Sequence, residues 1–516
     1  NYYSCLIYYI LYIYYLLYNF NTKLFISSKT KTYLLKIYKL SILNLSKMYK
    51  LSILNLSKTE TDLSKMDKLS ILNLLDNNKN PLNYDYNSDN IKYILNGFFQ
   101  AEGHIGGYFE NKNSVTFNPL VFISQNVSNE TIKLFKIMNN EFDNKLNYSI
   151  EKLTSGKWHI KIYSKNWDLI INKWIPYFNN TYGDKFIGLN ILLKIYYLYY
   201  SEFGKSHRFT KFTADHIDNS IKRIYLIYNL IDNSKRTLSI KDKVNLWLIN
   251  KNISEEIINN INYNNYDNYI NNIKNQFFKK CKNTFTINFL FIHGFFLGDG
   301  SFYIRIRSTK KLLWYIPILK INQKFTIYNK DLFNLIINYL NNNNINSKIR
   351  LIKNNTFIEF TIENQISIKA YAKLLTYYPN YYFNKTEQIH YLLQSSLLFG
   401  KIKVWREGHI ALLKLIYNYK VGNLYNLPNF NNNNTKKEEL NNHINIINDY
   451  FNNNISDLYY ITTTKNNQYK VKLPIKTYPK EKYISFGLDK SKALNKALNY
   501  RNTLLNKWLK DNNFDY

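Results

Sequence analysis

The sequence predicts an α+β fold made of two copies of one unit, on three observations. Two nonapeptides, at residues 95–103 and 292–300, share the order Gly, Phe, Phe, any residue, small residue, acid, Gly. Each is followed by the same order of expected strands and helices, and matching side chains recur at matching distances. Each unit is expected to run helix, hairpin, helix, hairpin, helix, which is the composition of an α+β domain.

Short apolar stretches predict the strands of each unit, and longer stretches with apolar residues three and four apart predict its helices. In the first unit we expect strands at 104–109 and 116–125, a helix at 129–142, a hairpin centred on 155–156, and helices near 166–177 and 185–200. In the second unit we expect strands at 301–307, 316–323, 348–353 and 357–363, and helices at 330–340, 367–377 and 385–398.

Two pairs of residues occupy equivalent places in the two units. Gln125 lies 22 residues after the last glycine of its nonapeptide and Gln323 lies 23 after its own. Lys185 and Lys385 follow the acids of the two nonapeptides by 83 and 86 residues. Both glutamines fall on the apolar side of their strand, at its end, which fits a central polar site. A strand that simply ends in a polar residue would have the same pattern.

Small residues recur four positions apart in each nonapeptide and therefore lie on one face of the predicted helix. They are Gly97 and Ala101 in the first helix and Gly294 and Gly298 in the second. Two such helices can pack backbone against backbone along these faces.

Each nonapeptide ends in a carboxylate, Glu102 or Asp299, followed by a glycine suited to end a helix. If the helices pair about a pseudo-twofold axis, the two carboxylates come side by side. Like charges at that distance are unfavourable unless a divalent cation binds between them. The pattern indicates a metal-dependent site that cleaves phosphodiesters. Two ordinary amphipathic helices with polar ends are the alternative, which the repetition disfavours.

The composition favours a polyanionic partner. The 516 residues, enough for two or three domains, include 69 Lys and Arg against 36 Asp and Glu, giving a net charge of +33. Nucleic acid is the first expected partner and an anionic membrane surface the second. Translation of a very AT-rich gene would also raise the content of Lys, Asn and Tyr. The two cysteines, Cys5 and Cys281, are too few for a disulfide framework or a zinc site, which fits a reducing compartment.

Both nonapeptides resemble the signature of the LAGLIDADG homing endonucleases and intron maturases, in the two-motif, single-chain form. The resemblance implies two αββαββα half-domains around a central two-helix interface. It implies that Glu102 and Asp299 bind Mg²⁺ (or Mn²⁺), and we expect the main-chain carbonyls of Ala101 and Gly298 to help. It also implies that Gln125 and Gln323 organise water and that Lys185 and Lys385 lie beside the scissile phosphates. Lysine is frequent throughout the chain, so a general surface role for these two is an equal alternative.

The alternation of polar and apolar residues in the predicted strands defines a cationic sheet face suited to the major groove of DNA. A solvated sheet face would show the same alternation. The candidate DNA-binding residues are Ser301, Tyr303, Arg305, Arg307, Lys320, Asn322, Lys348 and Arg350 in the second unit, and Lys157, His159, Lys161 and Tyr163 in the first. We interpret His104 and His293, which lie close to the acids in sequence, as structural.

The chain is expected to divide as follows. Residues 1–80 are an apolar leader and a repetitive arm, 91–203 the first half, 204–283 a polar Asn-rich insert, 284–425 the second half, 426–457 an Asn-rich linker, and 458–516 a small module. Residues 1–20 carry no charge and are long enough to span a bilayer. A leader translated from AT-rich DNA would have the same apolar and aromatic composition. Residues 458–516 are expected to form three strands and a helix and resemble the small AP2-like DNA-binding module, with a helical tail as the alternative.

The predicted function is a monomeric, site-specific homing endonuclease that cuts double-stranded DNA to leave 3′ overhangs. The alternative is a maturase that assists splicing of intron RNA on the same scaffold, and a membrane-associated protein ranks third. The AT-rich composition and the resemblance together predict a mitochondrial protein.

Overall fold

The computed structural model describes residues 67–75, 86–110, 116–203, 214–231, 238–308, 313–402, 404–422, 433–456, 458–475, 481–487 and 489–515. Nearly all of the predicted leader and arm, including residues 1–20, lies outside these ranges, apart from helix α3 (Lys68–Leu75). Within the described part of the chain, no helix has the length and apolar character needed to cross a membrane.

The first half folds into one four-stranded antiparallel sheet with helices. Its strands are β1 (Gly103–Phe109), β2 (Phe117–Asn126), β3 (Asn147–Lys152) and β4 (Trp158–Ser164), and its helices are α4 (Ser88–Glu102), α5 (Asn129–Glu141), α6 (Trp167–Leu169), the π-helical turn η1 (Ile170–Trp174), α7 (Ile175–Tyr177) and α8 (Asp184–Phe203). The strand order is β1-β2-β4-β3.

The second half repeats this arrangement. Its strands are β5 (Gly300–Ser308), β6 (Leu313–Lys324), β7 (Lys348–Ile352) and β8 (Phe357–Ile362), and its helices are α13 (Phe289–Asp299), α14 (Ile327–Asn342), α15 (Gln365–Leu375), the short 3₁₀ turns η3 (Pro379–Tyr381) and η4 (Phe383–Lys385), and α16 (Thr386–Leu398). The strand order β5-β6-β8-β7 matches that of the first sheet, so the predicted duplicated α+β fold is confirmed.

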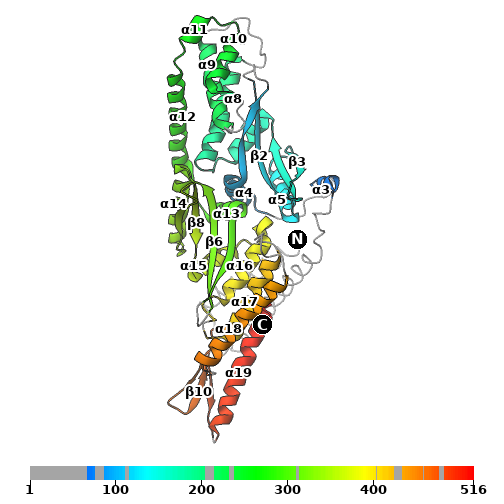
Figure 1. Cartoon of the computed structure of the whole chain (residues 1–516), viewed down its shortest axis with the longest axis vertical. Coiled ribbons are helices and arrows are strands. Elements are labelled where there is room, and N and C mark those ends of the chain that lie inside the picture. Colours follow the sequence, from blue (N-terminus) through cyan, green and yellow to red (C-terminus); the bar gives the residue numbers. More distant parts are fainter. Residues whose placement is uncertain are drawn as a thin grey trace, which may run out of the picture. The chain divides into compact units, whose positions relative to one another are not determined.

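Helices α4 and α13 pack directly against each other between the two sheets (Figure 1). A Cβ placed on Gly97 would lie 2.0 Å from the main-chain oxygen of Phe291, and one on Gly294 would lie 2.0 Å from that of Ile94. A Cβ on Gly298 would lie 2.3 Å from the Cβ of Ala101. The backbones therefore touch, and the predicted small residues are the ones that allow it.

The starts of these two helices are set by matching caps. Asn87 accepts a hydrogen bond from the main-chain N–H of Asn90 at the start of α4, and Asn288 accepts one from that of Phe291 at the start of α13. Asparagine is a favoured N-cap because its side chain replaces a missing intrahelical partner. The same capping residue thus fixes where both central helices begin.

The segment predicted as a polar insert is mostly helical. It contains α9 (Ala214–Leu230), α10 (Ile240–Asn250), α11 (Glu255–Asn259) and α12 (Tyr263–Thr284), and α9 and α12 pack against α8. Asparagine is abundant here, yet buried apolar side chains such as Ile221, Ile224 and Tyr228 recur three and four residues apart along α9. All residues from 223 to 228 are buried, so the second half of α9 is covered on every side by neighbours that include α8, α10 and α12.

Most of the segment expected to be an Asn-rich linker, residues 426–457, is a helix. α18 (Asn433–Asn454) packs against α17 (Arg406–Gly422), and Ile447 and Phe451 on it are buried. Leu440, Ile444, Ile447 and Phe451 are spaced four, three and four residues apart. This apolar stripe, hidden among asparagines, makes the segment an amphipathic helix.

The C-terminal module consists of an antiparallel sheet with the order β11-β10-β9 and one helix. The strands are β9 (Ile461–Thr463), β10 (Gln468–Val471) and β11 (Lys482–Ser485), and α19 (Lys490–Asp511) covers one face of them. Buried Arg501 of α19 donates to the main-chain oxygen of Tyr459 at 3.1 Å and stacks on the Tyr459 ring. The predicted three strands and helix are therefore present.

Candidate active site

The two acids of the nonapeptides lie together at the ends of the central helices. Glu102 is the last residue of α4 and Asp299 the last of α13. Burial raises the pKa of Glu102 to about 7, and the charge of Asp299 contributes to the rise. Burial likewise raises the pKa of Asp299 above its ordinary value. Two partly buried carboxylates that repel each other form a site in which a bound cation would relieve the repulsion.

Each acid is hydrogen-bonded to the glutamine predicted for its own half. Gln125 Nε2, at the end of β2, donates to Glu102 Oε1 at 2.9 Å. Gln323 Nε2, near the end of β6, donates to Asp299 Oδ2. Both hydrogen bonds favour the ionised carboxylate and oppose the effect of burial on the pKa of each acid. The two glutamines hold the acids in equivalent positions.

The two predicted lysines also occupy equivalent positions. Lys185 Nζ, from the first turn of α8, donates to the main-chain oxygen of Gly103. Lys385 Nζ, just before α16, donates to that of Gly300 at 2.8 Å. Burial lowers the pKa of both lysines, and the charges of the two acids oppose this. Each half thus places one acid, one glutamine and one lysine at a common centre.

The donor set of this centre suits a hard divalent cation. Carboxylate oxygens are the ligands that Mg²⁺ prefers. Ala101 and Gly298 lie in the last helical turn, where carbonyl groups lack intrahelical partners and the helix dipole is negative. Within the described residues, no three His, Cys, Asp or Glu side chains gather into a cluster that could hold a metal ion. The protein would therefore supply two carboxylates, and other ligands of an ion would be main-chain, water or substrate oxygens.

The two histidines near the acids have structural surroundings, as predicted. His293 is fully buried, its Nε2 lies 2.7 Å from the main-chain oxygen of Tyr381, and burial lowers its pKa to about 4. His104 stacks on the ring of Phe122 in the neighbouring strand, with ring centres 4.5 Å apart. The His293 ring packs against the rings of Phe289 and Tyr382, which are the surroundings of a structural side chain.

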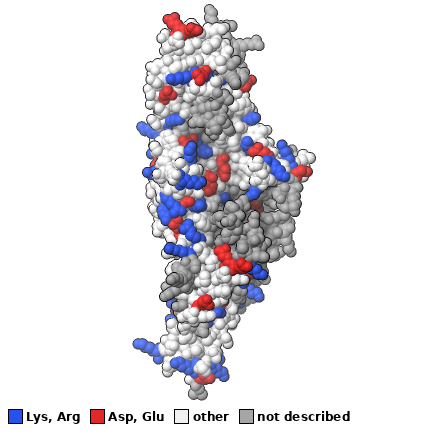
Figure 2. Space-filling view, viewed as in Figure 1, with Lys and Arg blue, Asp and Glu red and all other residues white. Residues whose placement is uncertain are grey.

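The predicted cationic faces are present on both sheets, with one exception. In the first sheet Lys161 lies over the Phe122 ring at 4.5 Å, and His159 Nδ1 lies 3.7 Å from Glu151. Lys157 lies in the turn before β4, outside the strand in which the sequence places it, because the strand begins at Trp158. In the second half, Lys and Arg side chains with carboxylates between them gather over the region of β6 and β8 (Figure 2).

Two carboxylates on the second sheet were not anticipated from the sequence. Glu359 pairs with Arg350 and Lys320, and Glu363 pairs with Lys348. The sequence does contain a signal for them, because residues 359 and 363 are an even number of positions apart and therefore fall on the same face of an extended strand. Which cations they meet depends on the register between strands, which the sequence does not show.

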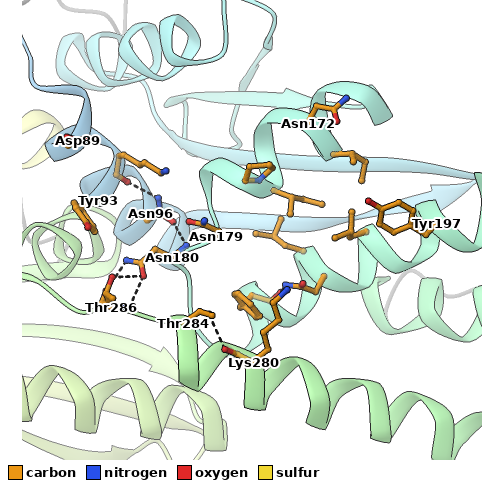
Figure 3. A pocket seen from close by; sticks show the side chains of 18 residues that line it. Asp89, Tyr93, Asn96, Asn172, Asn179, Asn180, Tyr197, Lys280, Thr284 and Thr286 are labelled. Atoms are coloured by element: carbon orange, nitrogen blue, oxygen red, sulfur yellow. Dashed lines mark hydrogen bonds between the residues drawn. The ribbon is translucent and has the colours of Figure 1, made fainter.

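A cavity of about 830 Å³ lies apart from this centre, between α4, α8 and residues 171–180 (Figure 3). None of the six candidate catalytic side chains lines it. Asn96 of α4 donates to the main-chain oxygen of Tyr177 at 2.9 Å and accepts from the main-chain N–H of Asn180. Asn180 in turn exchanges hydrogen bonds with Thr286, just before α13. These hydrogen bonds connect α4 with the segment just before α13.

One family model matches part of the second half of the chain. Residues 292–398 match the family model described as LAGLIDADG endonuclease. Over these residues the second half of the chain is similar to that family. This family consists of DNA-cleaving hydrolases that use divalent metal ions. The first half has the same order of strands and helices and supplies the second acid. No curated protein sequence is detectably similar to the chain.

Several solved structures resemble part of this chain. The I-LtrWI LAGLIDADG homing endonuclease bound to target DNA is 16% identical, covers 66% of this chain and 99% of its own, and has a TM-score of 0.44. The meganuclease I-SmaMI bound to DNA is 15% identical, with coverages of 64% and 99% and a TM-score of 0.44. The I-GzeII complex with its DNA target is 18% identical, with coverages of 63% and 97% and a TM-score of 0.43. I-SmaMI has also been crystallised with uncleaved DNA in the presence of calcium ions.

Proposed function

We propose that the chain is a site-specific endonuclease that hydrolyses phosphodiester bonds in both strands of duplex DNA. The observation that carries the proposal is the meeting of Glu102 and Asp299 at the contact of α4 and α13, each with its own glutamine and lysine. Two equivalent sets of groups at one centre fit two equivalent strand cuts. The proposal includes one chain acting as a monomer, 3′ overhangs and a role in the mobility of the element that encodes it.

The residues of this chain have separate tasks in that reaction. Glu102 and Asp299 would hold Mg²⁺ or Mn²⁺, and such an ion when bound supplies charge stabilisation and an activated water. Gln125 and Gln323 keep the acids oriented through their hydrogen bonds.

The positive charges of Lys185 and Lys385 stabilise negative charge that develops on the phosphate. Their bonds to the carbonyls of Gly103 and Gly300 fix their approach to the centre. The polar faces of the two sheets bind the duplex on either side.

We further propose that the C-terminal module adds a second DNA contact. One face of its sheet packs on α19, while Lys470 and Tyr483 form a cross-strand pair on the other face. Tyr483 is 50% exposed. Residues 458–516 hold 12 Lys and Arg against four Asp and Glu. A cationic β-surface of this kind fits the major groove.

Cleavage by variants of the two acids tests the main proposal. Wild-type protein is used to select its site from a randomised duplex library, and a plasmid carrying that site is then cut with Mg²⁺ under single-turnover conditions. Glu102→Gln and Asp299→Asn should each reduce the rate at least about 100-fold, because each removes a carboxylate from the centre while leaving the DNA-binding faces intact. Binding to the selected site, measured without metal, should change less than about threefold.

Glu151→Gln is the matched control, because it removes a carboxylate that is 61% exposed on the first sheet. It should cut at nearly the wild-type rate. Cleavage at the wild-type rate by either acid variant would show that the centre is not the nuclease site.

A further inference from the structure

A row of side chains crosses the second sheet on the face opposite to α14 and α16, and follows the strand order β5-β6-β8-β7. Lys320 Nζ of β6 lies 5.4 Å from the centre of the Tyr303 ring of β5 and 3.5 Å from Glu359 Oε2 of β8. Glu359 Oε1 accepts from Arg350 of β7, at 2.6 Å from Nε and 2.5 Å from Nη2. Both oxygens of one carboxylate are thus engaged by cations.

The centre of this row is buried and its end is exposed. The Glu359 side chain is 4% exposed, whereas that of Arg350 is 46% exposed. Glu359 therefore cannot itself reach a base in the groove. Arg350 can reach a base, because its guanidinium has five N–H donors and only Nε and Nη2 face Glu359. Its Nη1 lies 3.9 Å from Glu363 at the rim of the same face.

We propose that Glu359 is a positioning residue for base recognition: it fixes the guanidinium of Arg350 so that the Nη1 and Nη2 edge turned away from Glu359 reads a guanine in the major groove. This inference rests on the proposed function, since it assumes that the second sheet lies on duplex DNA. A guanine presents two acceptors, O6 and N7, that match two parallel N–H donors of arginine. An arginine held by a carboxylate has already lost rotamer freedom and loses less on binding.

The electrostatics give the proposal a distinctive consequence. A carboxylate on a DNA-binding face repels phosphates, so Glu359 weakens the general attraction of this sheet for any sequence. Removing its charge should therefore tighten binding to random DNA while weakening the preference for the selected base. If Glu359 only stabilised the sheet, its substitution would lower both the affinity for random DNA and the preference for the selected base.

The first sheet contains a matched pair that serves as a control. Glu151 of β3 stands opposite His159 of β4, as Arg350 of β7 stands opposite Glu359 of β8. The Glu151 side chain is 61% exposed and lies 3.7 Å from His159. Glu151→Gln changes the net charge by the same amount as Glu359→Gln, but releases no arginine.

The experiment is selection of bound sequences from a randomised duplex library by the full-length protein, for wild type, Glu359→Gln, Glu151→Gln and Arg350→Lys. Glu359→Gln should lose about tenfold discrimination at one or two adjacent positions in one half of the site, while affinity for random duplex rises about twofold or more. Arg350→Lys should lose discrimination at the same positions, because it keeps the charge and removes the fork. Glu151→Gln should leave those positions unchanged.

The double variant Glu359→Gln with Arg350→Lys decides whether the two residues act as one unit. Its loss at those positions should be no larger than that of Arg350→Lys alone, since Glu359 acts through Arg350. An unchanged preference in Glu359→Gln, or losses in the double variant that multiply, would overturn the inference and leave the proposed function standing. Failure of the wild-type protein to enrich any sequence would instead contradict the proposed function, and the inference with it.

Discussion

Replacing Glu102 with glutamine should make the metal-free protein more stable while it removes cleavage. Burial raises the pKa of Glu102 from its ordinary 4.5 to about 7. Because the folded-state pKa is the higher one, the folded protein binds more protons between these two values, and this group makes the wild type less stable as pH rises through them. Glutamine has nearly the same shape and no charge, so it does not impose this cost.

The size of the effect follows from the shift in pKa. This shift in pKa costs the folded state on the order of 3 kcal/mol at about pH 8, where the group is ionised, and on the order of 1 kcal/mol at about pH 5, where the folded protein must keep the group protonated. Glu102→Gln should therefore raise the free energy of unfolding by these amounts, with the larger gain at the higher pH. Equilibrium denaturation in chelator, at both pH values, measures the difference.

A control variant and a titration with Mg²⁺ test whether the gain in stability comes from Glu102. Glu151→Gln should change stability by less than about 0.5 kcal/mol at either pH, because that side chain is 61% exposed. Mg²⁺ should stabilise the wild type by mass action and the Glu102→Gln variant much less. A variant that is less stable than wild type, or a gain that is equal at both pH values, would refute the assignment of a raised pKa to the buried Glu102 carboxylate.

Two further predictions concern packing and the C-terminal module. Gly294→Ala should destabilise the fold by at least about 3 kcal/mol in denaturant unfolding, because its Cβ would lie 2.0 Å from the main-chain oxygen of Ile94. Gly156→Ala, at a φ of +80° with nothing within 4 Å, should lose only about 1 kcal/mol, and equal losses would contradict backbone contact at α4 and α13. Replacing Lys470 and Lys472 together by alanine should lower the salt dependence of DNA binding by about two phosphate contacts. Replacing Lys507 and Lys510 of α19 by alanine should leave the salt dependence of DNA binding unchanged. An equal salt dependence in the two double variants would exclude the sheet face as the DNA contact.

Local sequence patterns were sufficient for the order of helices and strands in both halves. Alternation in β5 and helical spacing in α5 act within a few residues, so they can be recognised without knowledge of the fold. The same patterns failed for α18, where asparagines surround a sparse apolar stripe whose partner, α17, is known only from the structure. The start of β4 at Trp158, which leaves Lys157 in a turn, also depends on pairing with a neighbouring strand.

By itself, the sequence determined that two equivalent units each contribute an acid, a glutamine and a lysine, because these residues recur at matching distances. Only the tertiary structure decided that Glu102 and Asp299 meet, since this requires α4 and α13 to touch through Gly97 and Gly294. It also decided that Glu359 lies buried beside Arg350, because strand register determines which side chains face each other. Contacts between residues far apart in the chain depend on the packing of whole elements, and no local pattern encodes them.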